Sequence, residues 1–415
     1  MRPHRIMKLA GVAALLAALL PAAPAAATAL VPAVPAPAVA TAPVPAADAA
    51  GPSTRAICPE DAEQASCLLR VAADGAGRVL RPAEAVQDDS GVLTAKDLQE
   101  AYRLPADLLG GGQTVAVVVP YDVGSAEADL AVYRAANGLH ACDAVFPCFR
   151  KVNQRGGDTP PPPDSGYALH AAAGLQLASA ACPNCKLLLV QADDASFANQ
   201  ALAVDQAAAQ GADAVVVMAG VAEFEEQAAQ AAHFDHPGVA ITAAAGAGFN
   251  SSGRQIVPAA YSTVVAVGGT ELWRDPAAKR GWSETAWAGT GSGCSLFETR
   301  PSWQRSGACG DQRTVADVSA VASPNTPVQV YAGALDGWVA ASGTPVAAAF
   351  IAGVYGLAGT DSATPAGKRL YRGSRYVFDI TAGANGTCGG SDVCTAVRGY
   401  DAPSGMGTPN GTGAF

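Results

Sequence analysis

The sequence predicts an α/β protein with a three-layer α/β/α arrangement around a mostly parallel sheet. The chain has 415 residues, of which 50% are hydrophobic and 15% charged, so it is long and apolar enough to bury one large core. From about Leu93 onward, short runs that are apolar at every position alternate with alanine-rich runs of helical length. Strands that are apolar on both faces are typical of a parallel sheet covered by helices on both sides.

Residues 1–29 have the composition of a secretory signal peptide. Three cations, Arg2, Arg5 and Lys8, precede the apolar stretch Leu9–Leu20, and small residues that suit cleavage follow it. We therefore expect a secreted, extracellular protein, because this apolar stretch is too short to span a membrane. Loss of the three cations changes the formal net charge from −10 to −13. No basic cluster then remains that would bind nucleic acid or an anionic membrane.

Two segments are expected between the signal peptide and the main domain. Residues 30–56 form a tract rich in Ala, Pro and Val, with almost no charge and no helical or alternating period. This composition predicts an extended linker. Residues 57–92 are interpreted as a short N-terminal segment or the remnant of a pro-region, and residues 93–415 as the main domain.

The elements of the main domain follow from the same alternation. The apolar runs predict strands at Thr114–Val119, Lys186–Gln191, Ala214–Met218, Val239–Ala244 and Val264–Gly268. The alanine-rich runs predict helices at Ala126–Asn137, Tyr167–Ala181, Ala201–Gln210 and Val346–Ala358. At the start of the last helix, Thr344 is expected to cap the first turn and Pro345 to occupy the first helical position. The small residues that follow would let this helix lie deep in the core.

The ten cysteines fall into five pairs of near neighbours. In an exported chain this pattern predicts five local disulfides. Zinc is the competing interpretation for the closest pair, but no second pair and no histidine follows it at finger-like spacing. The expected pairs are Cys58 with Cys67, Cys142 with Cys148, Cys182 with Cys185, Cys294 with Cys309, and Cys388 with Cys394.

Six segments of the main domain carry a resemblance to a known family. They are Ala181–Lys186, His236–Ala243, Val264–Thr270, Gly281–Trp287, Arg313–Ala320 and Gly399–Pro409. In composition and order they resemble the sedolisin family, the serine-carboxyl peptidases with a subtilisin-like fold, and in particular its secreted actinobacterial-type members. The resemblance spans roughly Leu93 to the C-terminus and implies the same fold.

The resemblance also implies where catalytic residues belong, and those positions hold other residues here. Family members begin one helix with Gly-Thr-Ser, whose serine attacks the scissile carbonyl; the matching triplet ends in Pro345. A glutamate and an aspartate, four residues apart on one helix face, act as general base and partner in the family. Their positions are matched by His170 and Gly174. An aspartic acid that donates a hydrogen bond to the oxyanion is matched by Ala247.

These four positions predict a protein with a peptidase fold that does not cut. Our first hypothesis is a secreted, inactive sedolisin-like protein that binds a peptide or protein in its degenerate cleft. The alternative is an active serine endopeptidase with an atypical catalytic set, in which Ser342 attacks, His170 acts as base and Asp122 or Asp164 orients it. A third hypothesis is a structural or colonisation-related exported domain with no ligand in the cleft.

The resemblance further implies a calcium site near the C-terminus. Family members hold Ca²⁺ by an Asp-Ile pair, by backbone carbonyls and by a later aspartate, an all-oxygen set that calcium favours. The matching residues are Asp379, Ile380, Val397, Gly399 and Asp401. The alternative interpretation is that the two aspartates cap turns around the loop closed by Cys388 and Cys394.

Overall fold

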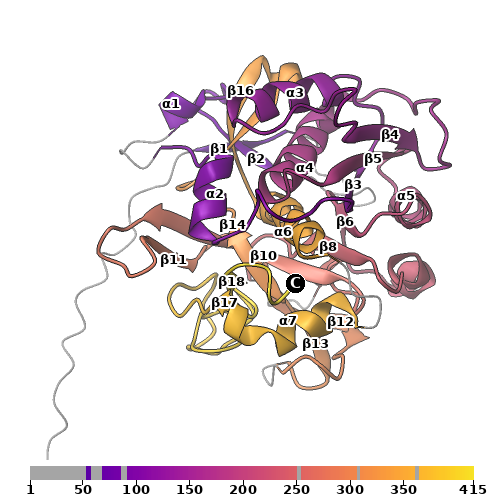
Figure 1. The fold of residues 1–415 in the computed structure, drawn as a ribbon. Coiled ribbons are helices and arrows are strands. Elements are labelled where there is room, and N and C mark those ends of the chain that lie inside the picture. The colour runs from indigo at the N-terminus through magenta and orange to yellow at the C-terminus, as the bar shows by residue number, and fades with distance from the viewer. Residues whose placement is uncertain (1–52, 58–67, 86–90, 250–253, 306–308, 360–363) are drawn as a thin grey trace, which may run out of the picture. The chain divides into compact units, whose positions relative to one another are not determined.

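An eight-stranded sheet forms the middle layer of the protein (Figure 1). The computed structural model describes residues 53–57, 68–85, 91–249, 254–305, 309–359 and 364–415. The sheet strands, in spatial order, are β11 (Trp282–Ala286), β10 (Val265–Arg274), β8 (Ala240–Ala244), β6 (Ala214–Val217), β3 (Thr114–Pro120), β5 (Lys186–Ala192) and β4 (Phe149–Asn153), with β14 (Val318–Val321) also paired to β10. All these pairings are parallel except that of β11, which confirms the predicted sheet.

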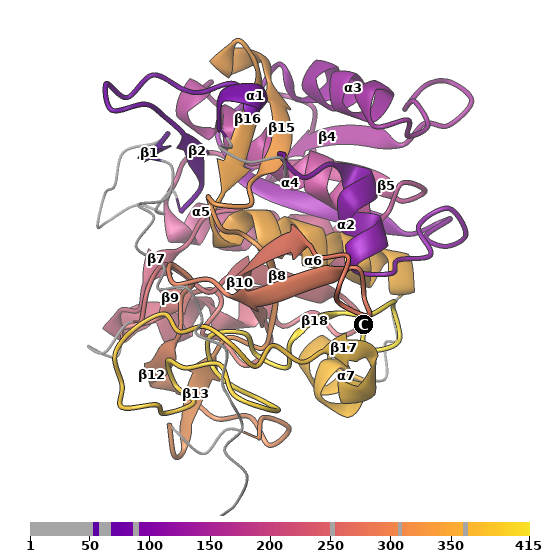
Figure 2. The ribbon, with the colours of Figure 1, turned by 90° about the vertical axis from the view of Figure 1, so that its left-hand side faces the viewer.

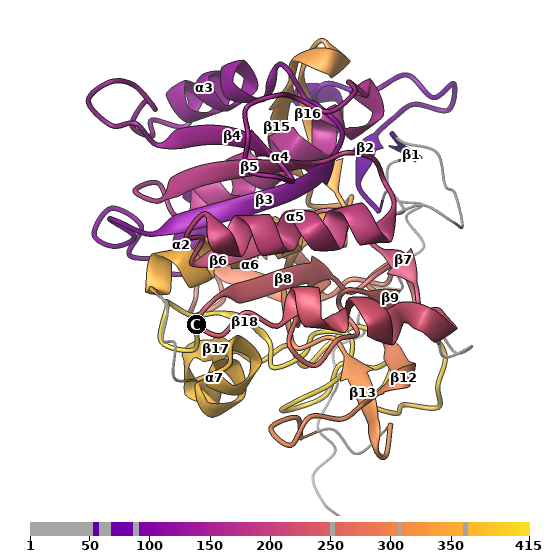
Figure 3. The ribbon, with the colours of Figure 1, turned by 90° about the vertical axis from the view of Figure 1, so that its right-hand side faces the viewer.

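Helices cover both faces of this sheet. The helices are α1 (Pro82–Ala85), α2 (Ala95–Ala101), α3 (Ala126–Ala136), α4 (Ala168–Ala181), α5 (Phe197–Ala209), α6 (Thr344–Ala358) and α7 (Ala366–Arg372). Along β3, Val115 and Val117 pack on the side of α4 and α6, whereas Ala116 and Val118 pack on the side of α5. Figure 3 shows α5 lying across the second face. The strand is therefore apolar on both faces because each face meets a helix.

Smaller elements complete the chain. A four-stranded sheet has the order β1 (Thr54–Ala56), β2 (Arg70–Ala72), β16 (Gly337–Ser342) and β15 (Val328–Ala332). Two-stranded pairs are formed by β7 (Val221–Ala222) with β9 (Ile256–Val257), β12 (Gly293–Thr299) with β13 (Gln312–Val315), and β17 (Val377–Phe378) with β18 (Thr408–Pro409). Short 3₁₀ helices are η1 (Ser165–Tyr167), η2 (Glu225–Phe234), η3 (Gly333–Leu335) and η4 (Ser374–Tyr376). Ala49–Phe415 forms one compact unit, and the predicted boundaries at residues 29, 56 and 92 stay predictions.

Three elements differ from the sequence prediction, each for a local reason. Helix α5 begins four residues earlier than expected, because the side chain of Ser196 accepts a hydrogen bond from the backbone N–H of Asn199 and caps it. Strand β10 continues to Arg274, because its polar second half pairs with β11. In α6 the prediction of a Thr344 cap is wrong. Gly343 is the N-cap residue, and no side chain caps this helix.

Four of the five predicted disulfides are confirmed. They join Cys142 to Cys148, Cys182 to Cys185, Cys294 to Cys309, and Cys388 to Cys394. The zinc interpretation of the closest pair is therefore wrong. Cys58 and Cys67 lie outside the described residues, as do the predicted signal peptide and most of the linker. Within the described ranges, none of the helices has both the length and the apolar character needed to cross a bilayer.

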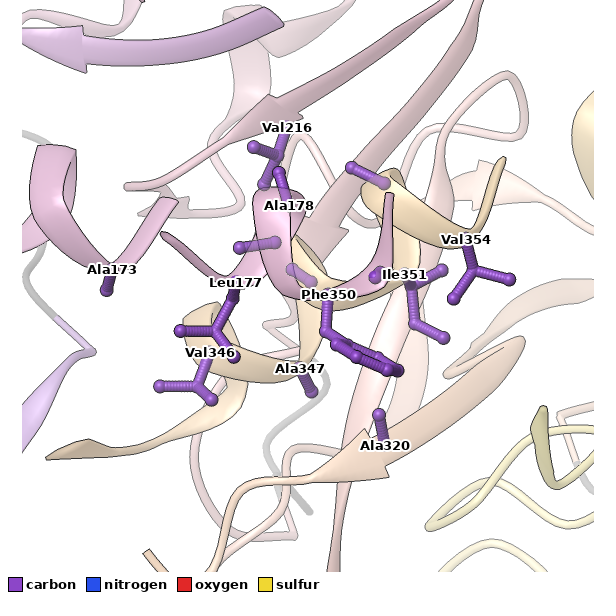
Figure 4. Packing of buried hydrophobic residues seen from close by; sticks show 14 of the residues in the cluster. Ala173, Leu177, Ala178, Val216, Ala320, Val346, Ala347, Phe350, Ile351 and Val354 are labelled. Carbon is purple, nitrogen blue, oxygen red and sulfur yellow. The ribbon is translucent and has the colours of Figure 1, made fainter. Parts of the chain in front are cut away.

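The centre of the core is the contact between α4 and α6 (Figure 4). Alanine and glycine line much of both helices, and Figure 4 shows Leu177 beside Val346, with Ala178 pointing toward Val216 of β6. The approach is closest at Gly353. A β-carbon at that position would lie 2.6 Å from the carbonyl oxygen of Ala178 and 2.7 Å from the β-carbon of Ala181. Only glycine fits this contact without a shift of the backbone.

A buried carboxylate joins elements from both ends of the described chain. The side chain of Glu284 is 1% exposed. One of its oxygens accepts hydrogen bonds from the Tyr102 hydroxyl at 2.8 Å and the Thr270 hydroxyl at 2.6 Å. The other accepts from the Arg280 guanidinium and the Thr408 hydroxyl, each at 2.8 Å. Four donors thus compensate the cost of burying this charge.

We predict that Gly353→Ala lowers the free energy of unfolding by about 1–3 kcal/mol, because the new methyl group overpacks the α4–α6 contact. Urea denaturation followed by circular dichroism measures this change. The matched control is Gly111→Ala, where no atom would lie within 4 Å of the added carbon, so stability should be unchanged or slightly raised. Equal stability losses in both variants would contradict the packing argument.

Candidate functional site

The first turns of α4 and α6 lie at the same end of the core. Near their other ends, Gly353 packs on Ala178 and a β-carbon at Gly356 would lie 3.1 Å from the sulfur of Cys185. Later residues of α6 thus contact later residues of the segment that contains α4, so the two helices run in the same direction. His170 lies in the first turn of α4 and Pro345 in the first turn of α6.

A hydrogen bond fixes the turn that contains Ala247 beside the start of α6. The hydroxyl of Thr344 donates to the carbonyl oxygen of Gly246 at 2.8 Å. Thr344 is the first residue of α6, one position past the N-cap Gly343, and its hydroxyl is used in this bond. The structure therefore brings the positions matched to the nucleophile, Pro345, and to the oxyanion donor, Ala247, to one place. Neither residue carries a polar side chain there, so no side-chain donor or nucleophile comes from either position.

His170 is completely buried and chemically isolated. Its side chain is 0% exposed, and neither ring nitrogen has a hydrogen-bond partner. Its ring packs against that of Tyr167, with the two centres 5.4 Å apart. Burial lowers the pKa of His170 to about 4, so the ring is neutral at pH 7. A general base must lie within hydrogen-bond reach of the proton that it takes, and His170 has no such contact.

The position matched to the second carboxylate is filled by its neighbours. A β-carbon at Gly174 would lie 2.5 Å from Cγ1 of Val117 and 3.2 Å from Sδ of Met218. Val117 belongs to β3, and Met218 directly follows β6. An aspartate side chain has no room between them. The packing of Val117 and Met218 therefore excludes a carboxylate side chain at this position.

The partly exposed side chain of Ile256 packs against the residues that follow two neighbouring strands of the sheet. In open parallel sheets, ligands bind outside the carboxyl ends of the strands. Gly220 follows β6, and a β-carbon there would lie 2.6 Å from the side chain of Ile256. Gly246 follows β8, and a β-carbon there would lie 2.9 Å from the same side chain. Pairing of β9 with β7 holds Ile256 in this place. Sequence reasoning missed this residue, because nothing in an isolated isoleucine marks it as a neighbour of these strand ends.

The alternative catalytic set is not assembled. Ser342 is the last residue of β16, 2% exposed, and lies opposite Arg70 of β2. Asp122 accepts hydrogen bonds from the Lys151 ammonium at 2.8 Å and the Gln191 amide at 3.0 Å. Partial burial raises the pKa of Asp122, but these two bonds outweigh it and hold the pKa below its usual value.

The other candidate orienting residue also has a structural role. The carboxylate of Asp164 accepts a hydrogen bond from the backbone N–H of Gly166 at 2.7 Å and caps η1. Since His170 has no hydrogen-bond partner, neither aspartate orients it. The serine, the histidine and the acid therefore do not form a relay in this arrangement.

The residues matched to the calcium site lie together in the C-terminal region. The carboxylate of Asp401 is buried and accepts hydrogen bonds from the N–H of Val397 at 2.9 Å and from the N–H and hydroxyl of Ser404, both at 2.8 Å. Asp379 accepts a bond from the N–H of Gly399 at 3.0 Å. Burial, with the nearby charge of Asp379, raises the pKa of Asp401 to about 7.

Asp401 thus caps the turn that leads to Ser404, whereas the bond from Gly399 to Asp379 joins two segments 20 residues apart. Both carboxylates still offer unused lone pairs. Among the described residues no group of three or more His, Cys, Asp or Glu side chains is placed to hold a metal. A site made of two carboxylates and the carbonyls of Ile380, Val397 and Gly399 does not need such a group. Its chemistry fits calcium, which favours oxygen ligands and often takes them from the backbone.

We predict that acid destabilises the protein through His170. Its pKa is lower in the folded than in the unfolded chain (about 4 against about 6.5). The unfolded chain therefore binds more protons in this range, and stability falls as the pH drops from 6.5 to 4, by about 3 kcal/mol. His170→Leu should remove this part of the pH dependence in urea titrations at several pH values, whereas substitution of the exposed His140 should not. An unchanged pH profile in His170→Leu would contradict the assignment.

Comparisons with known proteins agree with this architecture. No family model matches the chain. The chain is 30% identical to kumamolisin from Bacillus sp. (strain MN-32) over 353 residues, which cover 77% of this chain and 62% of kumamolisin. The structure of Pseudomonas sedolisin, a serine-carboxyl proteinase complexed with pseudo-iodotyrostatin, superposes with a TM-score of 0.65 at 20% identity, and the match covers 77% of this chain and 95% of that chain. The chain thus spans less than two thirds of the length of kumamolisin. It is similar to kumamolisin in sequence and to Pseudomonas sedolisin in fold.

Proposed function

We propose that this protein is an exported, non-catalytic member of the sedolisin family that binds a peptide or protein segment. The observation that carries the proposal is the packing around the four matched positions. Pro345 has no hydroxyl, His170 has no hydrogen-bond partner, and Gly174 has no room for a carboxylate. Acyl transfer needs an activated nucleophile, a base and a donor for the oxyanion. No side chain at these four positions supplies any of the three.

Export is the second part of the proposal. Disulfides persist mainly in oxidising compartments, and four of them join described cysteines. The signal-like composition of residues 1–29 supports the same destination. A secreted protein of this fold without catalytic groups would bind a partner or serve as a structural domain.

We predict no turnover of unfolded protein or peptide libraries by the purified protein between pH 3 and 8, the range over which carboxylates and histidine titrate. Pro345→Ser restores a hydroxyl at the nucleophile position and should remain inactive, because the base and its partner are still missing. Mass spectrometry of the substrates after incubation measures both results. Cleavage that disappears in Ser342→Ala would overturn the proposal in favour of an atypical serine endopeptidase.

We also propose a structural calcium ion at Asp379 and Asp401, with backbone carbonyls of Ile380, Val397 and Gly399 completing the site. The ion would cross-link two separate segments of the C-terminal region and relieve the repulsion between the carboxylates. Burial, to which the nearby charge of Asp379 adds, raises the pKa of Asp401 to about 7, and a bound cation would favour its charged form.

We predict that calcium raises the melting temperature and that a chelator reverses the rise, because a ligand that binds only the folded state stabilises it. Asp379→Asn should abolish the calcium-dependent shift. The control is Asp392→Asn in the neighbouring loop, whose carboxylate accepts a hydrogen bond from Ser391 and is no part of the proposed site. If calcium shifts the melting temperature of neither wild type nor control, the two aspartates serve only as hydrogen-bond acceptors.

A further inference from the structure

Strand β2 is an N-terminal strand laid along the edge of β16 (Figure 2). The two strands are antiparallel, with Val71 opposite Ala341 and Arg70 opposite Ser342. β16 leads directly into α6, so β2 lies beside the turn that holds the degenerate catalytic position. Without β2, this edge of β16 would expose unpaired backbone groups, which readily pair with an extended chain.

The contact continues past the strand to the turn before α6. A β-carbon at Gly343 would lie 2.4 Å from the carbonyl oxygen of Leu68 and 3.5 Å from Cα of Leu69. Gly343 has a φ of +106°, which also favours glycine. With this backbone in place, Ser342 and Thr344 are only 2% and 1% exposed. The N-terminal segment therefore covers the turn from Ser342 to Thr344.

From Leu69, which precedes β2, to Val71, the side chains alternate in the way that an edge-bound peptide requires. Leu69 and Val71 are 0% exposed and belong to the main core cluster. Arg70 turns away from this cluster, and its guanidinium donates to the hydroxyl and the carbonyl oxygen of Thr54 in β1. In peptide recognition by strand addition, the backbone gives affinity and pockets for alternate side chains give specificity.

We propose that the edge of β16 is the peptide-binding element of this protein and that Leu69–Ala72 is its resident ligand. The partner class is an extended peptide with large aliphatic residues at two alternate positions and any residue between them. This inference rests on the proposed peptide-binding function and gives it a location. At the carboxyl ends of β6 and β8, Ile256 already packs against Gly220 and Gly246, so a peptide there would have to displace it. A peptide that binds at β16 must take the place of β2.

The test uses the full chain with a specific protease site in place of residues 86–90, so that the resident strand is severed from the main domain. A fluorescent peptide with the sequence of Leu68–Asp74 is then titrated into cut and uncut protein. We expect the cut protein to bind it at least tenfold more tightly, because the uncut strand competes at high effective concentration. Val71→Asp in the protein weakens the resident strand, and the cut form of this variant should bind the wild-type peptide more tightly still.

Two control peptides test the alternation. Replacement of the residue equivalent to Val71 by Asp should weaken binding at least tenfold, whereas replacement of the one equivalent to Arg70 by Lys should have little effect. No binding to the cut Val71→Asp protein, or equal binding of both control peptides, would overturn the inference. Mass spectrometry of the same samples distinguishes failure of the binding site from failure of the proposed function. A cleaved peptide would contradict the absence of catalysis but not the binding site at β16.

Discussion

The close contact between α4 and α6 is the constraint on which the rest of the structure depends. Two helices that touch through alanine and glycine bring their backbones near each other, as at Gly353 and Ala178. This places the first turns of both helices in the same buried interior, where His170 is fully buried. A close-packed interior leaves few voids, so any side chain added between these helices and the sheet must displace another.

That constraint explains why the buried part of the candidate site is apolar. A peptidase of this fold places two carboxylates near the helix that carries its nucleophile, and buried carboxylates require partners. Here Val117 and Met218 fill the space around Gly174, and Ile256 packs against Gly220 and Gly246. Around Gly174 and His170 the region is a continuation of the hydrophobic core, whereas Ala247 is exposed. A carboxylate in place of Gly174 would lack space.

Much of the fold could be predicted from the sequence, because strands apolar on both faces and alanine-rich helices have strong local signals. The matched positions at His170, Gly174, Ala247 and Pro345 were also visible, since neighbouring segments fix their register. What the sequence did not reveal depends on contacts between distant residues. The place of Ile256 follows from the pairing of β9 with β7. The role of Leu69 follows from a strand that meets its partner about 270 residues later in the chain, which no local pattern encodes.

The carboxylate of Glu284 has a consequence for how the protein unfolds. It accepts hydrogen bonds from Tyr102, which follows α2, and from Thr408 in β18, near the C-terminus. If either segment detached alone, the charge would stay buried with fewer donors, at a cost of several kcal/mol. Local opening of one segment is therefore unfavourable unless the other opens as well. These two distant segments should exchange their amide hydrogens as parts of one cooperative unit.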